Sequence, residues 1–134
     1  MARFVRTIPR ASVQVYSFGL DPLVDGQTDA ALTPADTAIG PIMPWAGSVI
    51  ALSVQADEAA GAGVSSFDAK KDSTQFSIDL SLAADATEAY DTYAPGTYAF
   101  AAGASLGASY TSGTLTTNAG VRVDVYVLFN DVTV

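Results

Sequence analysis

The residues of this chain best suited to chemistry are its carboxylates, because the sequence has no histidine and no cysteine. Paired acids occur at Asp57 and Glu58 and in the group Asp85, Glu88 and Asp91. Glycosidases use two carboxylates as acid and base, but fourteen acidic residues on a small domain also bring some pairs together by chance. Nucleophile systems that need an imidazole or a thiol are excluded. We therefore predict no catalytic residues and a protein that is not an enzyme.

Metal and cofactor sites are not predicted either. Asp21, Asp25 and Asp29 recur in one segment and offer the hard oxygen ligands that Ca²⁺ prefers, but their spacing lacks the EF-hand pattern. Solvated loop acids are the ordinary interpretation. Residues 61–63, Gly-Ala-Gly, lack the lysine and spacing of a phosphate-binding loop, so we expect a turn there and no cofactor.

Aromatic side chains form the second group whose spacing could bind a ligand. Tyr90, Tyr93 and Tyr98 flank a Pro-Gly turn, where exposed rings could stack on sugars; cross-strand tyrosine pairs are the structural alternative. Trp45, the single tryptophan, is either an interface anchor or a rim residue that closes one end of a core. With Tyr126, these residues are predicted to form an oligomer interface or a glycan patch.

Positive charge is concentrated at the N-terminus. Residues 1–10 carry three of the six basic side chains and no acid, and the remainder has three basic and fourteen acidic side chains, a formal charge of −11. Such a body repels phosphate backbones, so we expect no nucleic-acid partner. The contrast favours a docking arm over a merely solvated tail. The predicted contact residues of this arm are Arg3, Phe4, Val5, Arg6, Ile8 and Arg10.

Alternating apolar residues indicate the elements that would position these side chains. The alternation is clearest at 76–82 and 121–129, and we expect the second of these to be a central strand. Other strands are predicted at 12–16, 37–43, 50–55, 63–70, 89–93, 97–100 and 105–111. Many short strands separated by turn residues are typical of an all-β protein with a single antiparallel β-sandwich.

The sequence divides into three parts. Residues 1–18 are predicted to be an extended N-terminal arm and first strand, 19–36 an irregular connection, and 37–134 the β-sandwich body. The longest apolar run has the length of a strand, and the start of the chain does not read as a secretion signal. We expect no membrane partner.

A resemblance rests on five segments. They are Pro44 to Val54, Ala60 to Gly63, the strand that begins at Phe76, Phe100 to Ala108, and Val121 to Val127. Together they resemble the small jelly-roll-like β-sandwich modules of tailed-bacteriophage virions, which occur as capsid decoration (cement) proteins and in head or tail fibres. Lys70 to Ser73 stands where such modules usually have a Lys-Asn-Gly hairpin.

The resemblance implies a structural virion protein that binds the outside of a phage capsid and reinforces contacts between capsomers. Its partners would be the major capsid protein and itself, as a homotrimer that covers Ala51, Tyr126 and Leu128. It would be made in the host cytoplasm and located on the capsid surface. The alternative is a fibre or tail-associated module that binds host-surface glycan. An exposed concave patch of the three tyrosines would favour that alternative.

Overall fold

The computed structural model describes residues 7–8, 13–33, 40–61, 65–130 and 132–133, the first and last of these pairs by their backbone alone. Within these ranges there are strands and no helix. The strands are β1 (Thr7–Ile8), β2 (Gln14–Leu20), β3 (Ala30–Ala31), β4 (Gly47–Ala56), β5 (Ser65–Lys71), β6 (Thr74–Gln75), β7 (Leu80–Leu82), β8 (Glu88–Thr92), β9 (Tyr98–Phe100), β10 (Leu106–Thr111), β11 (Val121–Phe129) and β12 (Val132–Thr133).

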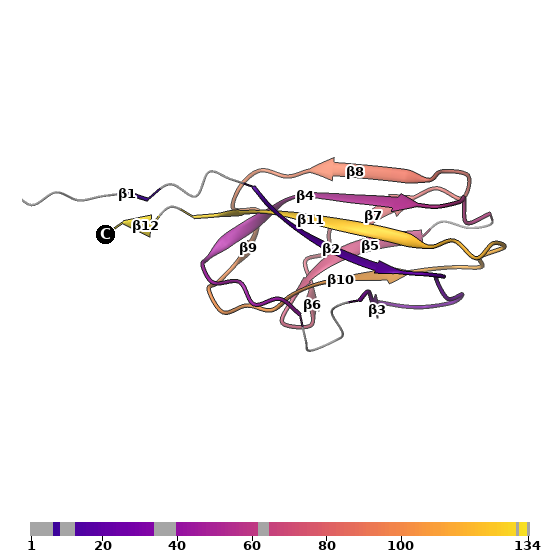
Figure 1. Cartoon of the computed structure of the whole chain (residues 1–134), viewed down its shortest axis with the longest axis horizontal. Helices are drawn as coiled ribbons and strands as arrows, with labels where there is room; N and C mark the ends of the chain where they lie inside the picture. The colour runs from indigo at the N-terminus through magenta and orange to yellow at the C-terminus, as the bar shows by residue number, and fades with distance from the viewer. Residues whose placement is uncertain (1–6, 9–12, 34–39, 62–64, 131, 134) are drawn as a thin grey trace, which may run out of the picture.

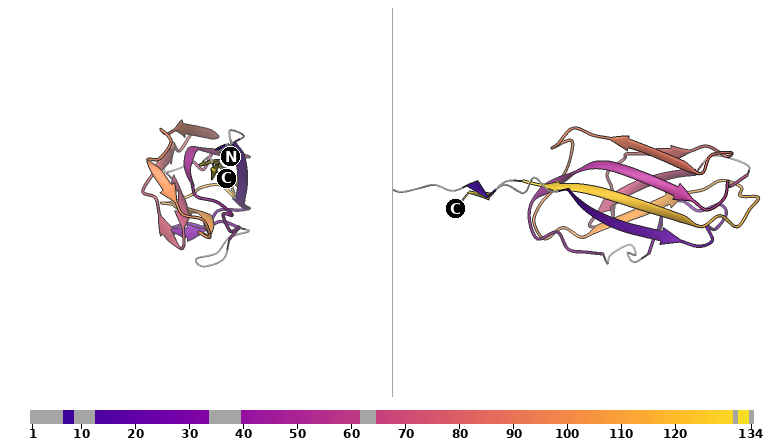
Figure 2. Two further views of the ribbon diagram at one scale, coloured as in Figure 1. Left: turned by 90° about the vertical axis from the view of Figure 1, so that its left-hand side faces the viewer. Right: turned by 45° about the horizontal axis from the view of Figure 1, so that its top comes forward.

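Two antiparallel sheets pack together and form the body (Figure 1). The first sheet has the order β2-β11-β4-β8, with β9 also paired to β4, and the second has the order β3-β10-β5-β6, with β7 also paired to β5. Viewed from one end, the sheets face each other around a common interior (Figure 2). The antiparallel β-sandwich predicted from the sequence is confirmed, and its jelly-roll connectivity stays a prediction.

The core lies between the two sheets, and every second residue of β11 contributes to it. Val123, Val125 and Val127 are fully buried, and β11 pairs with β2 on one side and β4 on the other. The prediction of a central strand at 121–129 is confirmed. Phe67 and Tyr110 of the second sheet stack on each other with ring centroids 6.5 Å apart and belong to the same core. Burial of these apolar surfaces is the main stabilising contribution.

The continuous strand predicted at 76–82 is wrong, although its apolar side chains do face the core. The chain pairs with β5 as β6 and again as β7, and leaves the sheet between them. Ser77 and Asp79 there have positive φ angles of 63° and 53°, and the Ile78 N–H donates to Asp68 Oδ2 at 3.1 Å. Alternation reports which side chains face a core, and it does not show whether the backbone stays paired.

The strand predicted at 12–16 from its alternating valines is part of β2, but these valines do not face the core. Val13 and Val15 are exposed, whereas Phe18 is buried opposite Val123. The strand also continues to Leu20 and is an integral part of the first sheet. The short run of alternating valines was misleading because the bulkier aromatic residues that follow fill the core.

Two further segments differ from their predicted strands. Residues 37–39 lie outside the described residues, and 40–43 form only an isolated bridge between Ile42 and Ser105. In β4, the register shifts between Tyr126 and Val127 of the neighbouring strand. This bulge buries Val49 and leaves Ile50 only partly buried, because an extra residue moves the following side chains to the other face.

Candidate functional site

The outer face of the first sheet is the best-defined candidate surface. Residues directly opposite each other across antiparallel strands share a face, and those that flank the buried valines point away from the core. They form three rows from β2 to β8, which are Gly19-Arg122-Gln55-Glu88, Ser17-Asp124-Ser53-Tyr90 and Val15-Tyr126-Ala51-Thr92. Two rows are polar and the third is largely apolar.

A groove of about 390 Å³ runs along β4 on this face. Its floor carries the small side chains of Ala51 and Ser53, and its sides carry Tyr90 on β8 and Arg122 and Tyr126 on β11. The groove exists because small residues on the middle strand lie between larger ones on its neighbours. The sequence pattern shows the sizes, but the order β11-β4-β8 is needed to place them side by side.

A hydrogen-bond network fixes the polar side of the groove. The Ser17 hydroxyl donates to Asp124 Oδ1 at 2.6 Å, and Arg122 Nε donates to the same oxygen at 2.9 Å. Arg122 Nη2 donates to Ser17 Oγ at 3.2 Å. These three residues lie on the two paired strands β2 and β11, so the sheet itself holds their relative positions. The pair contributes little stability because Arg122 is largely exposed.

The predicted tyrosine patch is divided between two places. Tyr90 is 79% exposed on the outer face, whereas Tyr93 and Tyr98 pack edge to face, with centroids 4.9 Å apart, against the core. Phe76 continues this cluster at 6.1 Å from Tyr98. Burial and the neighbouring Asp91 raise the pKa of the Tyr93 hydroxyl. Of the predicted aromatics, the groove therefore brings together Tyr90 and Tyr126 but not Tyr93 or Tyr98.

Trp45 lies where β4 begins and β11 ends. Its ring packs edge to face on Phe129 with centroids 5.5 Å apart, and Phe129 in turn packs on Phe100 at 6.1 Å. Trp45 thus covers one end of the core while 44% of its surface stays exposed. We call this end of the sandwich, where β2 and β4 begin and β11 ends, the terminal end.

Two residues of the predicted N-terminal arm lie in a short ribbon beyond the terminal end of the sandwich. Thr7–Ile8 pair antiparallel with Val132–Thr133, so β1 and β12 form this ribbon (Figures 1 and 2). The other predicted contact residues lie outside the described residues, and they are Arg3, Phe4, Val5, Arg6 and Arg10. For Ile8 only the backbone pairing is described. The pairing of this arm with the C-terminal segment had no sequence signal.

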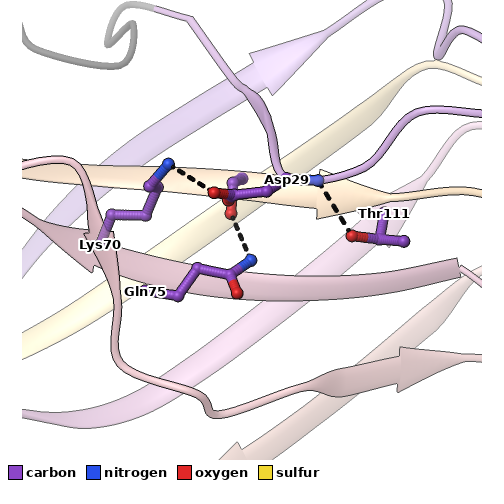
Figure 3. A network of polar contacts seen from close by, with 5 residues as sticks. Asp29, Lys70, Gln75 and Thr111 are labelled. Carbon is purple, nitrogen blue, oxygen red and sulfur yellow. Dashed lines mark hydrogen bonds and ion pairs between the residues drawn. The ribbon is translucent and has the colours of Figure 1, made fainter.

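The aspartates of the connection have separate partners. Asp25 Oδ1 accepts the Leu115 N–H at 3.0 Å, and Asp21 lies beside Gly120. Asp29 Oδ2 accepts from Lys70 Nζ at 3.0 Å, and the Asp29 N–H donates to Thr111 Oγ1 at 3.1 Å (Figure 3). Within the described ranges, no three acidic side chains gather closely enough to hold a metal ion.

The paired acids considered for catalysis are exposed. Asp57 Oδ1 accepts the Gly120 N–H at 2.8 Å, which is a structural contact, and Glu88 and Asp91 lie on the edge strand β8. The buried acid is a different one, Asp68, which the sequence did not single out. Burial raises the pKa of the Asp68 carboxyl to about 6, and Asp68 Oδ2 accepts the Ile78 backbone N–H at 3.1 Å.

Comparisons with known proteins add no family to this description. No protein-family model matches the chain, and no curated protein matches it. No helix among the described residues is long and apolar enough to cross a membrane. The fold and the surface therefore define a small β-sandwich with a terminal ribbon at one end and a groove on one outer face.

Proposed function

We propose that this chain is a structural protein of a tailed-phage virion, which binds the outside of the capsid and reinforces contacts between capsomers. The observation that carries the proposal is the ribbon of β1 and β12 at the terminal end. It supports the proposal because the basic N-terminal segment of the sequence adjoins this ribbon, whose strands pair with each other and not with either sheet of the body. The major capsid protein is the proposed partner, and the capsid surface is the proposed location after synthesis in the host cytoplasm.

Charge distinguishes the arm from the rest of the protein. Three basic and no acidic residues precede position 11, whereas the remainder carries −11. A partner surface that attracts the arm is therefore acidic, and its pockets would take Phe4 and Val5. The ribbon lowers the entropic cost of docking because the backbone of Thr7 and Ile8 is already paired with β12.

Self-association would use the apolar row of the outer face. Val15, Ala51 and Tyr126 share this row, and Leu128 lies further along β11 toward the terminal end. Val15 and the neighbouring Val13 are among the exposed large apolar residues. We propose a homotrimer in which a second copy covers this row. Several arms on one assembly would convert later capsid contacts into intramolecular ones and raise avidity.

The experiment is co-sedimentation of the full chain with undecorated capsids. A variant that lacks residues 2–6 keeps β1 and should lose most capsid binding while its circular dichroism and thermal unfolding stay unchanged. The matched control replaces residues 2–6 by a Gly-Ser segment of equal length, which separates arm length from arm chemistry and should also fail to bind. Full occupancy by either variant would move attachment to the body.

The second candidate function is a fibre or tail-associated module that binds host-surface glycan. The exposed Tyr90 at the edge of a groove favours it, whereas the packing of Tyr93 and Tyr98 against the core removes two thirds of the patch it was expected to use. Copy number in purified virions distinguishes the two. A number near that of the major capsid protein supports decoration, and a few copies support a fibre or tail.

A further inference from the structure

We propose that the groove along β4 binds a neutral hexopyranose chain, with Tyr90 as its stacking platform and Arg122 and Asp124 as its polar anchors. The inference gives the second candidate function a specific site and a ligand class. It does not depend on the capsid contacts of the arm, but the groove shares Ala51 and Tyr126 with the proposed trimer interface, so a saccharide and a second copy would compete for this face.

The shape of the groove suits a flat ring. Neighbouring strands lie about 4.8 Å apart, so β8 and β11, on either side of β4, are separated by roughly 10 Å. Between them the side chains of Ala51 and Ser53 leave the floor low, and the volume is about 390 Å³. A six-membered ring can enter such a groove, with its neighbours in the chain extending along β4.

Tyr90 supplies the apolar surface. Its side chain points outward from the edge strand β8 in the same row as Ser53, and it is the most exposed large apolar residue of the described chain. A tyrosine ring offers an apolar face and a polar hydroxyl, which matches the apolar C–H face and the hydroxyl rim of a pyranose. Tyr126, one row away on β11, bounds the groove on its opposite side.

The polar anchors are arranged before any ligand arrives. Asp124 Oδ1 accepts from both Ser17 and Arg122, so Oδ2 can accept from a sugar hydroxyl, and the exposed guanidinium has N–H groups left to donate. A sugar hydroxyl both donates and accepts, and it can therefore bridge a carboxylate and a guanidinium. Because the network already holds these side chains, binding loses little of their conformational entropy.

The charge of the groove selects among sugars. The carboxylates of Glu88 and Asp124 face it together with a single cation, Arg122. Sulfated or carboxylated sugars would meet this excess of negative charge and be repelled. The ligand class is therefore a neutral saccharide, and the same argument disfavours a nucleic-acid phosphate.

The test is isothermal titration of the full chain with cellohexaose, maltohexaose, mannohexaose and chitohexaose, and with a heparin hexasaccharide as the anionic comparison. At least one neutral hexasaccharide should bind with a Kd below about 1 mM, and heparin should not. Tyr90→Ala should weaken that binding about tenfold, whereas Tyr90→Phe should keep it within about threefold. Ser53→Leu, which fills the floor, should abolish binding.

Controls keep the result specific. Ile42→Ala removes an exposed apolar side chain that is not part of the groove and should bind like the unmodified chain, as should the variant that lacks residues 2–6. Thermal unfolding confirms that each variant is folded. The proposal is overturned if none of the neutral hexasaccharides binds, if heparin binds in preference, or if Tyr90→Ala and Ser53→Leu leave the affinity unchanged. None of these results bears on the capsid co-sedimentation, so the two proposals fail separately.

Discussion

Lys70 Nζ lies 3.0 Å from Asp29 Oδ2, a contact between residues 41 positions apart that ties the connection after β2 to the middle of the second sheet. Only 4% of Lys70 is exposed, and a buried ammonium needs a partner to offset its lost hydration. Burial opposes ionisation of Asp29, but hydrogen bonds from Ser109 and Lys70 outweigh it and hold the Asp29 pKa below its ordinary value. The aspartate that the sequence offered as a calcium ligand is thus the counterion of a lysine.

Asp29→Ala should destabilise the fold, because it leaves the Lys70 ammonium buried without its partner. Breaking a fully buried pair costs about 3–5 kcal/mol, and since the Asp29 side chain is 37% exposed we expect roughly 1–3 kcal/mol. Urea unfolding at pH 7 measures it. Asp85→Ala, at an exposed loop position, is the matched control and should change the unfolding free energy by less than about 0.5 kcal/mol. Equal effects of the two variants would show that the ion pair is not stabilising.

Asp68 should lower the free energy of unfolding as the pH rises, which is the reverse of the usual effect of an aspartate. Burial raises its pKa in the folded protein from 3.8 to about 6, with a further contribution from the neighbouring charge of Asp79. The folded state therefore binds the proton more tightly than the unfolded state. Proton binding at Asp68 adds its full contribution to the free energy of unfolding below about pH 4, and this contribution is lost as the pH rises through 6.

Asp68→Asn is the test of that dependence, since an amide can still accept the Ile78 N–H through its oxygen. The variant should be more stable than the unmodified chain at pH 8, by at most about 3 kcal/mol, and the advantage should vanish near pH 4. Urea unfolding at several pH values between 4 and 8 measures the two curves. Parallel curves would contradict the assignment of the raised pKa to Asp68.

Gly47 begins β4 at a place where no side chain fits. A Cβ there would lie 2.4 Å from the Leu128 backbone oxygen and 2.9 Å from Phe129 Cα, so the backbone of β11 would have to move. We expect Gly47→Ala to destabilise by about 1–3 kcal/mol. Gly113→Ala is the control, because a Cβ at Gly113 meets nothing within 4 Å, and thermal unfolding should show almost no change. A shift of similar size in both variants would mean that the end of β4 is not tightly packed.

A structural feature can be predicted from this sequence where the residues that determine it lie within one segment of the chain. The alternation at 121–129 specifies a strand that is buried on one face, and it does so within the strand itself. The contact of Lys70 with Asp29 gives no such local pattern, because folding over 41 residues brings them together. The groove also lacks a local sequence pattern, because Ser53 and Tyr90 become neighbours only when β4 and β8 pair. Sequence reasoning found the aromatics and missed Arg122 and Asp124 as their neighbours.

The trimer proposal predicts that a charge in the apolar row prevents self-association. Val15 is 47% exposed on the edge strand β2, so Val15→Lys should leave the monomer folded while a desolvated lysine opposes any interface there. Sedimentation equilibrium at micromolar concentration should give a trimer for the unmodified chain and a monomer for the variant. Gln14→Lys, at an exposed neighbour on the same strand, is the control for added charge and should remain trimeric. A monomeric unmodified chain would refute self-association in solution.

The arm proposal predicts different salt dependence for its charged and apolar residues. Arg3→Glu, Arg6→Glu and Arg10→Glu together should weaken binding to undecorated capsids most strongly at low ionic strength, because exposed charges are screened over about 8–10 Å at ordinary salt. Phe4→Ala should weaken binding by a nearly constant factor across the same salt series, since apolar burial does not depend on screening. Co-sedimentation between roughly 25 and 500 mM NaCl compares the slopes. Identical slopes for the unmodified chain and the triple variant would show that the arginines do not face acidic groups, and that the basic arm attaches by its apolar side chains alone.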